Sequence, residues 1–214
     1  MKTEDLIALL AAQAQPVPRH AARRALALAL LAGLPLSLAL MLAGYGLRPG
    51  LAASLVQQPM ALLKLLLPAL VAVAGFVAIE RLARPGVPVR RAFWGVVLPL
   101  LLLWILGLAA WLGAPAAERP ELLWGRTWRT CALSISWIAL PVFAASLLAL
   151  RGLAPTRPAL AGAAAGVLAA GSGAAVYALH CPELAAPFLA IWYVLGMAIP
   201  VAAGAWLGPR VLRW

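Results

Sequence analysis

Residues 92–113 read AFWGVVLPLLLLWILGLAAWLG, a stretch of 22 residues without a charged side chain. An α-helix needs about 20 apolar residues to cross the hydrocarbon core of a bilayer, so this stretch is long enough to span one. Five further stretches of similar length and composition lie on either side of it. They are residues 25–46, 59–79, 131–150, 159–179 and 185–207. We therefore predict an all-α polytopic membrane protein, a bundle of six transmembrane helices.

The composition of the whole chain supports this interpretation. Of its 214 residues, 65% are hydrophobic and only 11% are charged, and the mean hydropathy is +0.98. A water-soluble domain of this length needs far more polar surface. The gaps between the apolar stretches are too short for a separate soluble domain. We predict a tail at residues 1–24, which carries a short partner-binding helix, and a six-helix membrane domain at residues 25–214.

The basic residues are distributed unevenly between the two sides of the predicted bundle. Twelve of the 17 lie on the side of the termini, and five lie on the opposite side. The five are Arg48, Lys64, Arg119, Arg126 and Arg129. The positive-inside rule then predicts that both termini are cytoplasmic. The net charge of +11 is explained by this topology. We do not expect a nucleic acid partner, because the basic residues form no continuous stripe.

Both cysteines of the chain fall on the opposite, trans side, where they are able to meet. Cys131 opens the fourth predicted helix, and Cys181 follows the fifth. In a bacterium this side is the periplasm, an oxidising compartment that permits a disulfide. A cysteine at a helix N-terminus beside Arg126 and Arg129 is expected to have a lowered pKa, which favours the thiolate, the reactive and metal-binding form.

The residues alone leave three roles open for these thiols. They are inert packing residues, a redox or thiol-reactive pair, or metal ligands together with His180, with Glu183 as a further oxygen donor. Cys131, His180 and Cys181 fall short of the usual tetrahedral ligand set, so the metal signal is weak. The chain contains no paired intramembrane carboxylates, no Gly-rich phosphate loop and no Ser-His-Asp arrangement. We expect neither an enzyme nor a cofactor.

The N-terminal tail contains a short amphipathic helix at residues 3–14. Thr3 is able to cap it, and Glu4 and Asp5 lie in the first turn, where the helix dipole favours acids. An apolar stripe follows at helical spacing: Leu6, Ile7, Leu9 and Leu10. The prolines within residues 15–18 should end the helix. About 12 residues are marginally helical alone in water, so a protein groove or the membrane surface must cover the stripe. The acidic start favours the groove.

Lys64 is the only charged residue well inside an apolar stretch. Either it snorkels to the interface, or it pairs with a trans-side acid or a thiolate. The acids available on that side are Glu118, Glu121 and Glu183. On the fifth predicted helix Gly162, Gly166 and Ala170 form a row of small residues, which predicts close helix packing.

The chain as a whole resembles the NrsF-type family of bacterial six-helix membrane anti-sigma factors. No single motif is strong, but the joint arrangement in this order is fairly specific. The residues that carry the resemblance are Met-Lys-Thr-Glu-Asp-Leu-Ile at 1–7, Lys64 after Pro59, Arg-Leu-Ala-Arg-Pro-Gly at 81–86, Cys131, Trp137, Leu140-Pro141, Tyr-Ala-Leu-His-Cys at 177–181, Trp192-Tyr193 and Leu-Arg-Trp at 212–214. One departure is Gly50, where an acidic residue is expected.

The resemblance implies a regulator of the bacterial inner membrane. Such proteins hold an extracytoplasmic-function sigma factor through the cytoplasmic N-terminal segment, here Thr3 to Leu10. The two cysteines are linked to release under oxidative or heavy-metal stress, which makes Cys131 and Cys181 the expected sensing residues. Membrane lipid is the other expected partner. A small permease or thiol/metal transporter is the alternative function, although Lys64 is the only polar residue suited to line its path.

Overall fold

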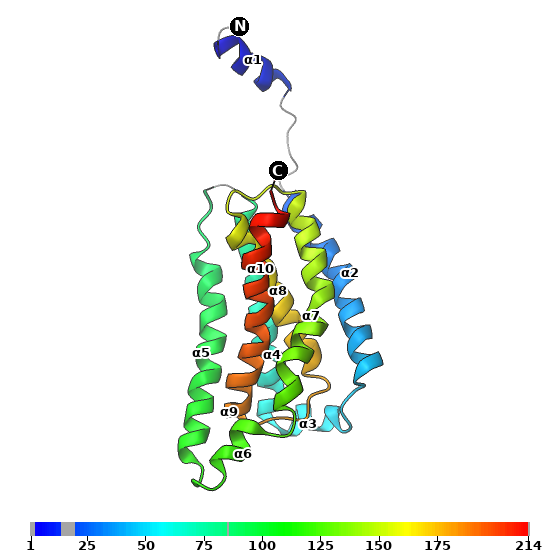
Figure 1. The fold of residues 1–214 in the computed structure, drawn as a ribbon, viewed down its shortest axis with the longest axis vertical. Helices are drawn as coiled ribbons and strands as arrows, with labels where there is room; N and C mark the ends of the chain where they lie inside the picture. The colour runs from blue at the N-terminus through cyan, green and yellow to red at the C-terminus, as the bar shows by residue number, and fades with distance from the viewer. Residues whose placement is uncertain (1–2, 14–19, 85, 214) are drawn as a thin grey trace.

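The computed structural model describes residues 3–13, 20–84 and 86–213, and all regular structure in these residues is helical (Figure 1). The predicted all-α class is confirmed. In chain order the helices are α1 (Thr3–Gln13), α2 (Ala21–Gly44), α3 (Leu51–Gln57), α4 (Pro59–Leu82), α5 (Arg90–Gly113), α6 (Arg119–Trp124), α7 (Trp128–Arg151), α8 (Pro158–Tyr177), α9 (Ala186–Phe188), the π-helix η1 (Leu189–Tyr193) and α10 (Val194–Val211).

Six helical segments are long and apolar enough to cross a membrane, as predicted. They are α2, α4, α5, α7 with the short α6 before it, α8, and the continuous run from α9 through η1 to α10. Every predicted boundary lies within four residues of the observed one. The largest differences are at the end of the sixth helix, Val211, and at the start of the first, which begins at Ala21 and includes Arg23 and Arg24. Arginine is a good helix former, so these two residues extend the helix past the apolar stretch.

Helix α8 lies at the centre of the bundle, with α4, α7 and α10 packed on it. Most of its residues are Ala or Gly, which allows neighbouring backbones to approach closely. A Cβ atom on Gly166 would lie 2.5 Å from the Cα of Val201 in α10, and one on Gly162 would lie 2.8 Å from the Cα of Gly208. Ala170, the third small residue of the row, is 1% exposed. The predicted close packing is confirmed.

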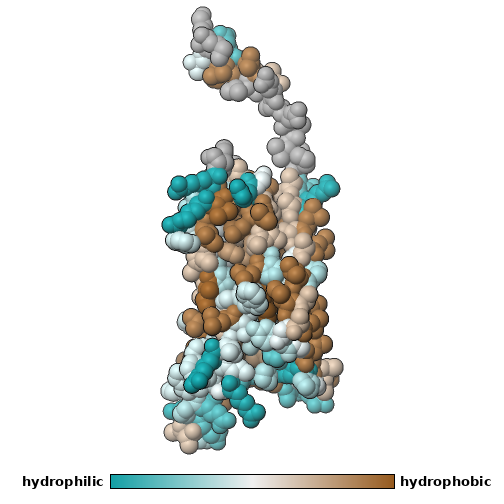
Figure 2. Space-filling model, turned by 45° about the vertical axis from the view of Figure 1, so that its right-hand side comes forward, coloured by the Kyte–Doolittle hydropathy of each residue, from teal (hydrophilic) through white to brown (hydrophobic). Residues whose placement is uncertain are grey.

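The remaining spanning helices lie around this centre. Helix α2 packs against α7, and α5 stands at the outside, where it contacts α4 and α9 (Figure 1). Most of the α5 surface is exposed in the isolated chain, including Trp94 and Trp104. Figure 2 shows hydrophobic side chains across the middle of the molecule and hydrophilic ones gathered toward its two ends. This distribution is the one a bilayer requires.

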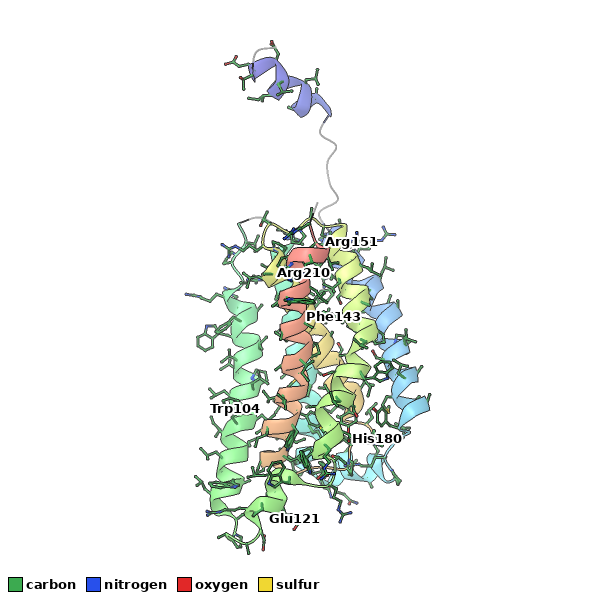
Figure 3. The ribbon with its side chains drawn as sticks, in the orientation of Figure 1. Trp104, Glu121, Phe143, Arg151, His180 and Arg210 are labelled. Atoms are coloured by element: carbon green, nitrogen blue, oxygen red, sulfur yellow. The ribbon has the colours of Figure 1, made fainter. Side chains whose placement is uncertain are left out.

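The two ends of the bundle carry different elements. The chain termini lie at one end, and Arg151 and Arg210 lie there too (Figures 1 and 3). His180 and Glu121 lie at the opposite end, together with α3 and α6. The three segments predicted to share one side, residues 47–58, 114–130 and 180–184, therefore do share one end of the molecule. This end contains the candidate site.

Helix α1 stands apart from the bundle, beyond the end that carries the termini (Figure 1). It confirms the predicted tail helix, with bounds Thr3–Gln13. The break predicted at residues 15–18 lies outside the described residues.

Candidate functional site: a buried thiol and lysine centre

The two cysteines meet in the interior, as the topology predicted. Cys131 lies in the first turn of α7, and Cys181 lies in the segment at residues 178–185 that joins α8 to α9. Both are free thiols, both are 0% exposed, and both belong to one hydrophobic cluster. Each is close enough to affect the pKa of the other. Two neighbouring thiols are suited to form a disulfide when the pair loses two electrons.

Lys64 of α4 points into this centre rather than toward the interface. It is 3% exposed, and its Nζ donates hydrogen bonds to the backbone oxygens of Cys181 at 2.6 Å and Glu183 at 2.7 Å. Its Nζ also lies 5.4 Å from the centre of the Tyr193 ring. The snorkelling interpretation is therefore wrong, and the pairing with a carboxylate or a thiolate stays a prediction, because the ammonium binds backbone oxygens. The carbonyls hold the ammonium in place because a buried charge must be hydrogen-bonded.

The Glu183 carboxylate binds the N-terminus of α7 instead of Lys64. Its Oε1 accepts hydrogen bonds from the backbone N–H of Arg126 at 2.7 Å and of Thr127 at 3.2 Å, and from the Thr127 hydroxyl at 3.4 Å. Arg126 and Thr127 directly precede the first residue of α7, and the helix dipole favours an anion there. Gly125 makes room for the carboxylate, because a Cβ atom at this position would lie 2.8 Å from Glu183 Oε2. Glu183 thus ties the 178–185 segment to the helix that carries Cys131.

A second cation, Arg48, holds the same segment from outside. Its backbone N–H donates to Leu179 O at 3.1 Å, and its guanidinium donates to the backbone oxygens of Cys181 at 3.5 Å and Pro182 at 3.4 Å, and to Ser54 Oγ. The 178–185 segment is therefore fixed by Lys64 from within the bundle and by Arg48 from its end.

His180 faces away from the thiols. Its Nδ1 lies 3.1 Å from Gly46 O, and its ring packs against Tyr45 and Tyr177 (Figure 3). Across the described residues, no group of three His, Cys, Asp or Glu side chains is placed to hold a metal ion. The structure thus brings together two members of the predicted metal set, Cys131 and Cys181, without the third.

The electrostatics of the pair differ from the sequence expectation. The neighbouring Cys131 thiol and the positive charge of Lys64 lower the pKa of Cys181, against the opposing effect of its burial. The sequence predicted a lowered pKa for Cys131, and two features of the structure oppose that effect. Arg126 and Arg129 are exposed to solvent, and the Glu183 carboxylate lies at the positive end of α7.

Tryptophans lie beside the site, since Trp128 and Trp192 pack against the hydrophobic cluster that contains both cysteines. Trp124, Trp128 and Trp192 pack on one another, and the Trp192 indole N–H donates to Leu123 O at 2.9 Å. Trp192 belongs to η1, the only π-helix in the described residues. A π-helix shifts the hydrogen-bond register and leaves carbonyls available. One of them, Ala190 O, accepts a hydrogen bond from Trp104 Nε1 at 3.0 Å.

The predicted partner-binding residues form a separate site on α1. Thr3, Glu4 and Asp5 are exposed, and so are the apolar residues Leu6 at 41%, Ile7 at 61% and Leu9 at 52%. The side chain of Leu10, the fourth member of the apolar stripe, lies outside the described residues. The bundle leaves the described part of this stripe uncovered.

Sequence reasoning missed the roles of Arg48 and of the Glu183 cap, and it left Lys64 undecided. A lysine inside a spanning helix is costly unless it has partners, and this cost was the available signal. Nothing comparable marked Arg48 or Glu183, because their partners are mostly backbone groups.

Comparisons with known proteins agree on one family. Residues 10–214 match a family described as "Negative regulator of sigma F", NrsF. The "Probable anti-sigma-F factor NrsF" of Azospira oryzae is 44% identical over 214 residues, and the "Anti-sigma-F factor NrsF" of Caulobacter vibrioides is 39% identical over 215 residues. Each alignment covers 100% of both chains, so it includes the tail that precedes the family match. No solved structure matches the chain.

Proposed function

The chain belongs to the NrsF family of negative regulators of sigma F, and from that premise we propose that it is a membrane-bound anti-sigma factor with a sensing centre at Cys131 and Cys181. Both relatives carry the name anti-sigma-F factor. In this proposal the partner is a sigma factor of the extracytoplasmic-function class, the protein lies in the bacterial inner membrane, and both termini are cytoplasmic. The protein acts by binding and not by catalysis.

The exposed apolar stripe on α1 is the observation that carries the sequestration part of the proposal. Leu6, Ile7 and Leu9 present apolar surface on one side of a short helix that the bundle leaves uncovered. An amphipathic helix of this kind binds by laying its apolar side into a groove of another protein. Glu4 and Asp5 make a membrane-surface role less favourable, since anionic lipid repels them. The groove of a sigma factor is the occupant we propose.

The buried thiol pair is the proposed trigger. An oxidant in the periplasm joins Cys131 to Cys181, the 178–185 segment moves relative to α7, and the tail loses affinity for the sigma factor. Heavy-metal stress reaches the same pair only through the reactivity of its thiols, since no larger ligand group is gathered in the described residues. To release most of the partner, the signal must change binding by about 5 kcal/mol.

The transporter alternative receives no support from the cavities. The two spaces that touch Lys64 have volumes of about 10 Å³ each, roughly enough for one water molecule. One of them is lined by apolar side chains apart from Lys64 and Tyr193. We therefore do not propose a permease.

Capture of sigma factors by the solubilised protein tests the proposed function. The full chain is immobilised beside a form that lacks residues 1–18, and both are offered the extracytoplasmic-function sigma factors of the host. We expect one sigma factor to be retained by the full chain only. If the full chain retains no sigma factor, the anti-sigma role is contradicted. If both forms retain the same amount, the contact lies outside residues 1–18.

A matched pair of variants tests the apolar stripe itself. Leu6→Asp with Leu9→Asp adds two charges to the stripe, and we expect repression of the sigma-dependent promoter to be lost while the protein stays in the membrane. Ala8→Asp with Ala12→Asp adds the same charges to the opposite side of α1, as helical spacing dictates, and should leave repression intact. Equal loss in both double variants would indicate a general effect of charge on the tail.

A further inference from the structure

The end of the bundle that carries the termini has a large excess of positive charge. The chain contains six acidic residues. Three of them lie at the opposite end, and two lie on α1, which stands apart from the bundle (Figure 1). Glu80, near the end of α4, is the sixth, and it pairs with Arg84 at 3.3 Å. The basic residues of the bundle at this end are Arg23, Arg24, Arg81, Arg84, Arg90, Arg91, Arg151, Arg157, Arg210 and Arg213.

A cavity lies within this basic end, between two connections of the chain. The end of α4 and the connection to α5 supply Leu82, Arg84 and residues 86–89, and the connection from α7 to α8 supplies Thr156 and Arg157. Its volume is about 420 Å³. Small-molecule sites in proteins measure roughly 300–1,000 Å³, so this cavity is large enough for a small ligand or a lipid headgroup.

Two guanidinium groups border the cavity, one from each connection. The charge of Arg84 is balanced in part by Glu80. The Arg157 guanidinium has neither a hydrogen-bond partner nor an ion pair among the described residues. A guanidinium presents a planar fork of N–H donors that matches the oxygens of a phosphate group. The pair therefore makes the cavity suited to a phosphate anion.

The starts of two spanning helices add to the positive potential around the cavity. Val89 directly precedes α5 and Arg157 directly precedes α8, and both residues line the cavity. Neither helix has a side-chain cap at its start or an acidic residue in its first turn. Unpaired N–H groups at a helix start carry partial positive charge, so these two starts favour an anion in the space beside them.

The remaining lining of the cavity is mainly apolar. Leu82, Val87, Pro88 and Val89 provide it, and the hydrogen bond from Arg81 Nη1 to Pro88 O at 2.9 Å fixes the connection that carries three of them. These residues lie between the ends of two membrane-spanning helices, which is the level of the lipid headgroups. A ligand that joins a phosphate to an apolar part fits this lining better than free inorganic phosphate does.

We propose that this cavity is a binding site for a phosphate ester, with Arg84 and Arg157 as its anion-binding residues. An anionic phospholipid headgroup and a soluble phosphate ester are the two sources of this chemistry. The apolar lining and the position at the membrane surface favour the headgroup, because basic pockets between spanning helices are suited to anionic lipids. The site lies away from the apolar stripe of α1 and from both thiols, so it goes beyond the anti-sigma function.

Native mass spectrometry of the solubilised full chain, freed of lipid, tests the site. The protein is mixed with equal amounts of dioleoylphosphatidylglycerol, which is anionic, and dioleoylphosphatidylcholine, whose choline group is repelled by the surrounding arginines. We expect one molecule of phosphatidylglycerol to be retained in preference to phosphatidylcholine. In Arg84→Gln with Arg157→Gln the dissociation constant for phosphatidylglycerol should rise by about tenfold, the size expected for two charge contacts at exposed positions.

Arg91→Gln with Arg151→Gln is the matched control. These two arginines are also exposed, come from the same two regions of the chain and lie outside the lining of the cavity. The control removes the same charge and should keep the preference for phosphatidylglycerol. An equal loss in both double variants would indicate a general attraction of the basic end for anionic lipid, and it would overturn the proposed site.

A substitution that changes no charge tests the cavity itself. Thr156→Trp fills part of the space, and it should weaken the binding of phosphatidylglycerol, whereas Thr156→Ser should preserve it. Thr156 is exposed in a connection between helices, so neither substitution disturbs the core of the bundle. If Thr156→Trp binds phosphatidylglycerol as well as the unaltered chain does, the lipid lies outside the cavity and the proposal is wrong.

Glycerol 3-phosphate distinguishes the two sources of the phosphate. If it binds the unaltered chain as tightly as phosphatidylglycerol and fails to bind Arg84→Gln with Arg157→Gln, the site stands and its ligand is a soluble ester. If only phosphatidylglycerol binds, the ligand is the lipid headgroup. Equal retention of the two lipids without binding of glycerol 3-phosphate would overturn the proposal. The same conclusion would follow if the double variant left all binding unchanged.

Discussion

The contact between α8 and α10 allows a stability prediction whose size follows from the geometry. We consider Gly166→Ala, which adds one methyl group where the two helices are closest. The new Cβ atom would lie 2.5 Å from the Val201 Cα and 2.7 Å from the Pro200 carbonyl carbon. Backbone atoms cannot rotate away, so the helices must separate by about 1 Å to reach ordinary carbon–carbon contact.

The expected cost is the balance of two effects. Overpacking of this kind costs about 1–3 kcal/mol, and contact with several backbone atoms places Gly166→Ala toward the upper end. The higher helix propensity of alanine returns at most about 1 kcal/mol. We expect a net loss of about 2 kcal/mol, which for a chain of this length lowers Tm by roughly 4–8 °C.

The two buried thiols provide the assay. Because Cys131 and Cys181 are both 0% exposed, a dye that fluoresces on reaction with thiols reports unfolding of the solubilised protein as it is heated. Gly113→Ala is the matched control, since a Cβ atom on this last residue of α5 meets nothing within 4 Å. If Gly166→Ala and Gly113→Ala unfold at the same temperature, the close approach of α8 and α10 is refuted.

Three further predictions concern the site and its orientation. Mild oxidation should join Cys131 to Cys181 within one chain, seen as a faster band on a non-reducing gel that reducing agent reverses; a serine at either position should abolish it, and a band in the serine variants would disprove the pairing. Glu183→Gln should destabilise the protein by about 1–2 kcal/mol through loss of the charged helix cap, whereas the exposed Glu121→Gln should change little; equal Tm values would contradict the cap. Alkaline phosphatase fused to the C-terminus should be inactive if that end is cytoplasmic, and an active fusion would reverse the predicted topology.

Much of the fold was predictable because lipid imposes strict rules on sequence. A charged residue in the hydrocarbon core is costly, so each spanning helix appears as a long apolar stretch with basic residues at its ends. The short helices α3 and α6 were not predicted, because segments of seven and six residues carry too little periodicity to identify. The start of α2 was misplaced because Arg23 and Arg24 look like tail residues while they continue the helix.

The candidate site was predictable only as far as topology reaches. Because successive spanning helices run in opposite directions, the sequence alone placed Cys131 and Cys181 at the same end of the bundle. Whether Lys64 turned outward or inward depended on how α4 packs on α8 and where the 178–185 segment crosses. The lowered pKa predicted for Cys131 has a similar origin, since Arg126 and Arg129 are close to it in sequence, whereas the structure shows both arginines exposed.

The sequence by itself determined the number of spanning helices, the two ends of the bundle, and the presence of an amphipathic tail helix. Only the tertiary structure decided that Lys64 holds the segment around Cys181, that Glu183 binds the start of α7, and that Arg48 holds the same segment from the end of the bundle. The physical reason lies in the partners. Lys64 and Glu183 are held mainly by backbone carbonyls and N–H groups, which nearly every residue possesses, so their positions leave no mark on the order of the side chains.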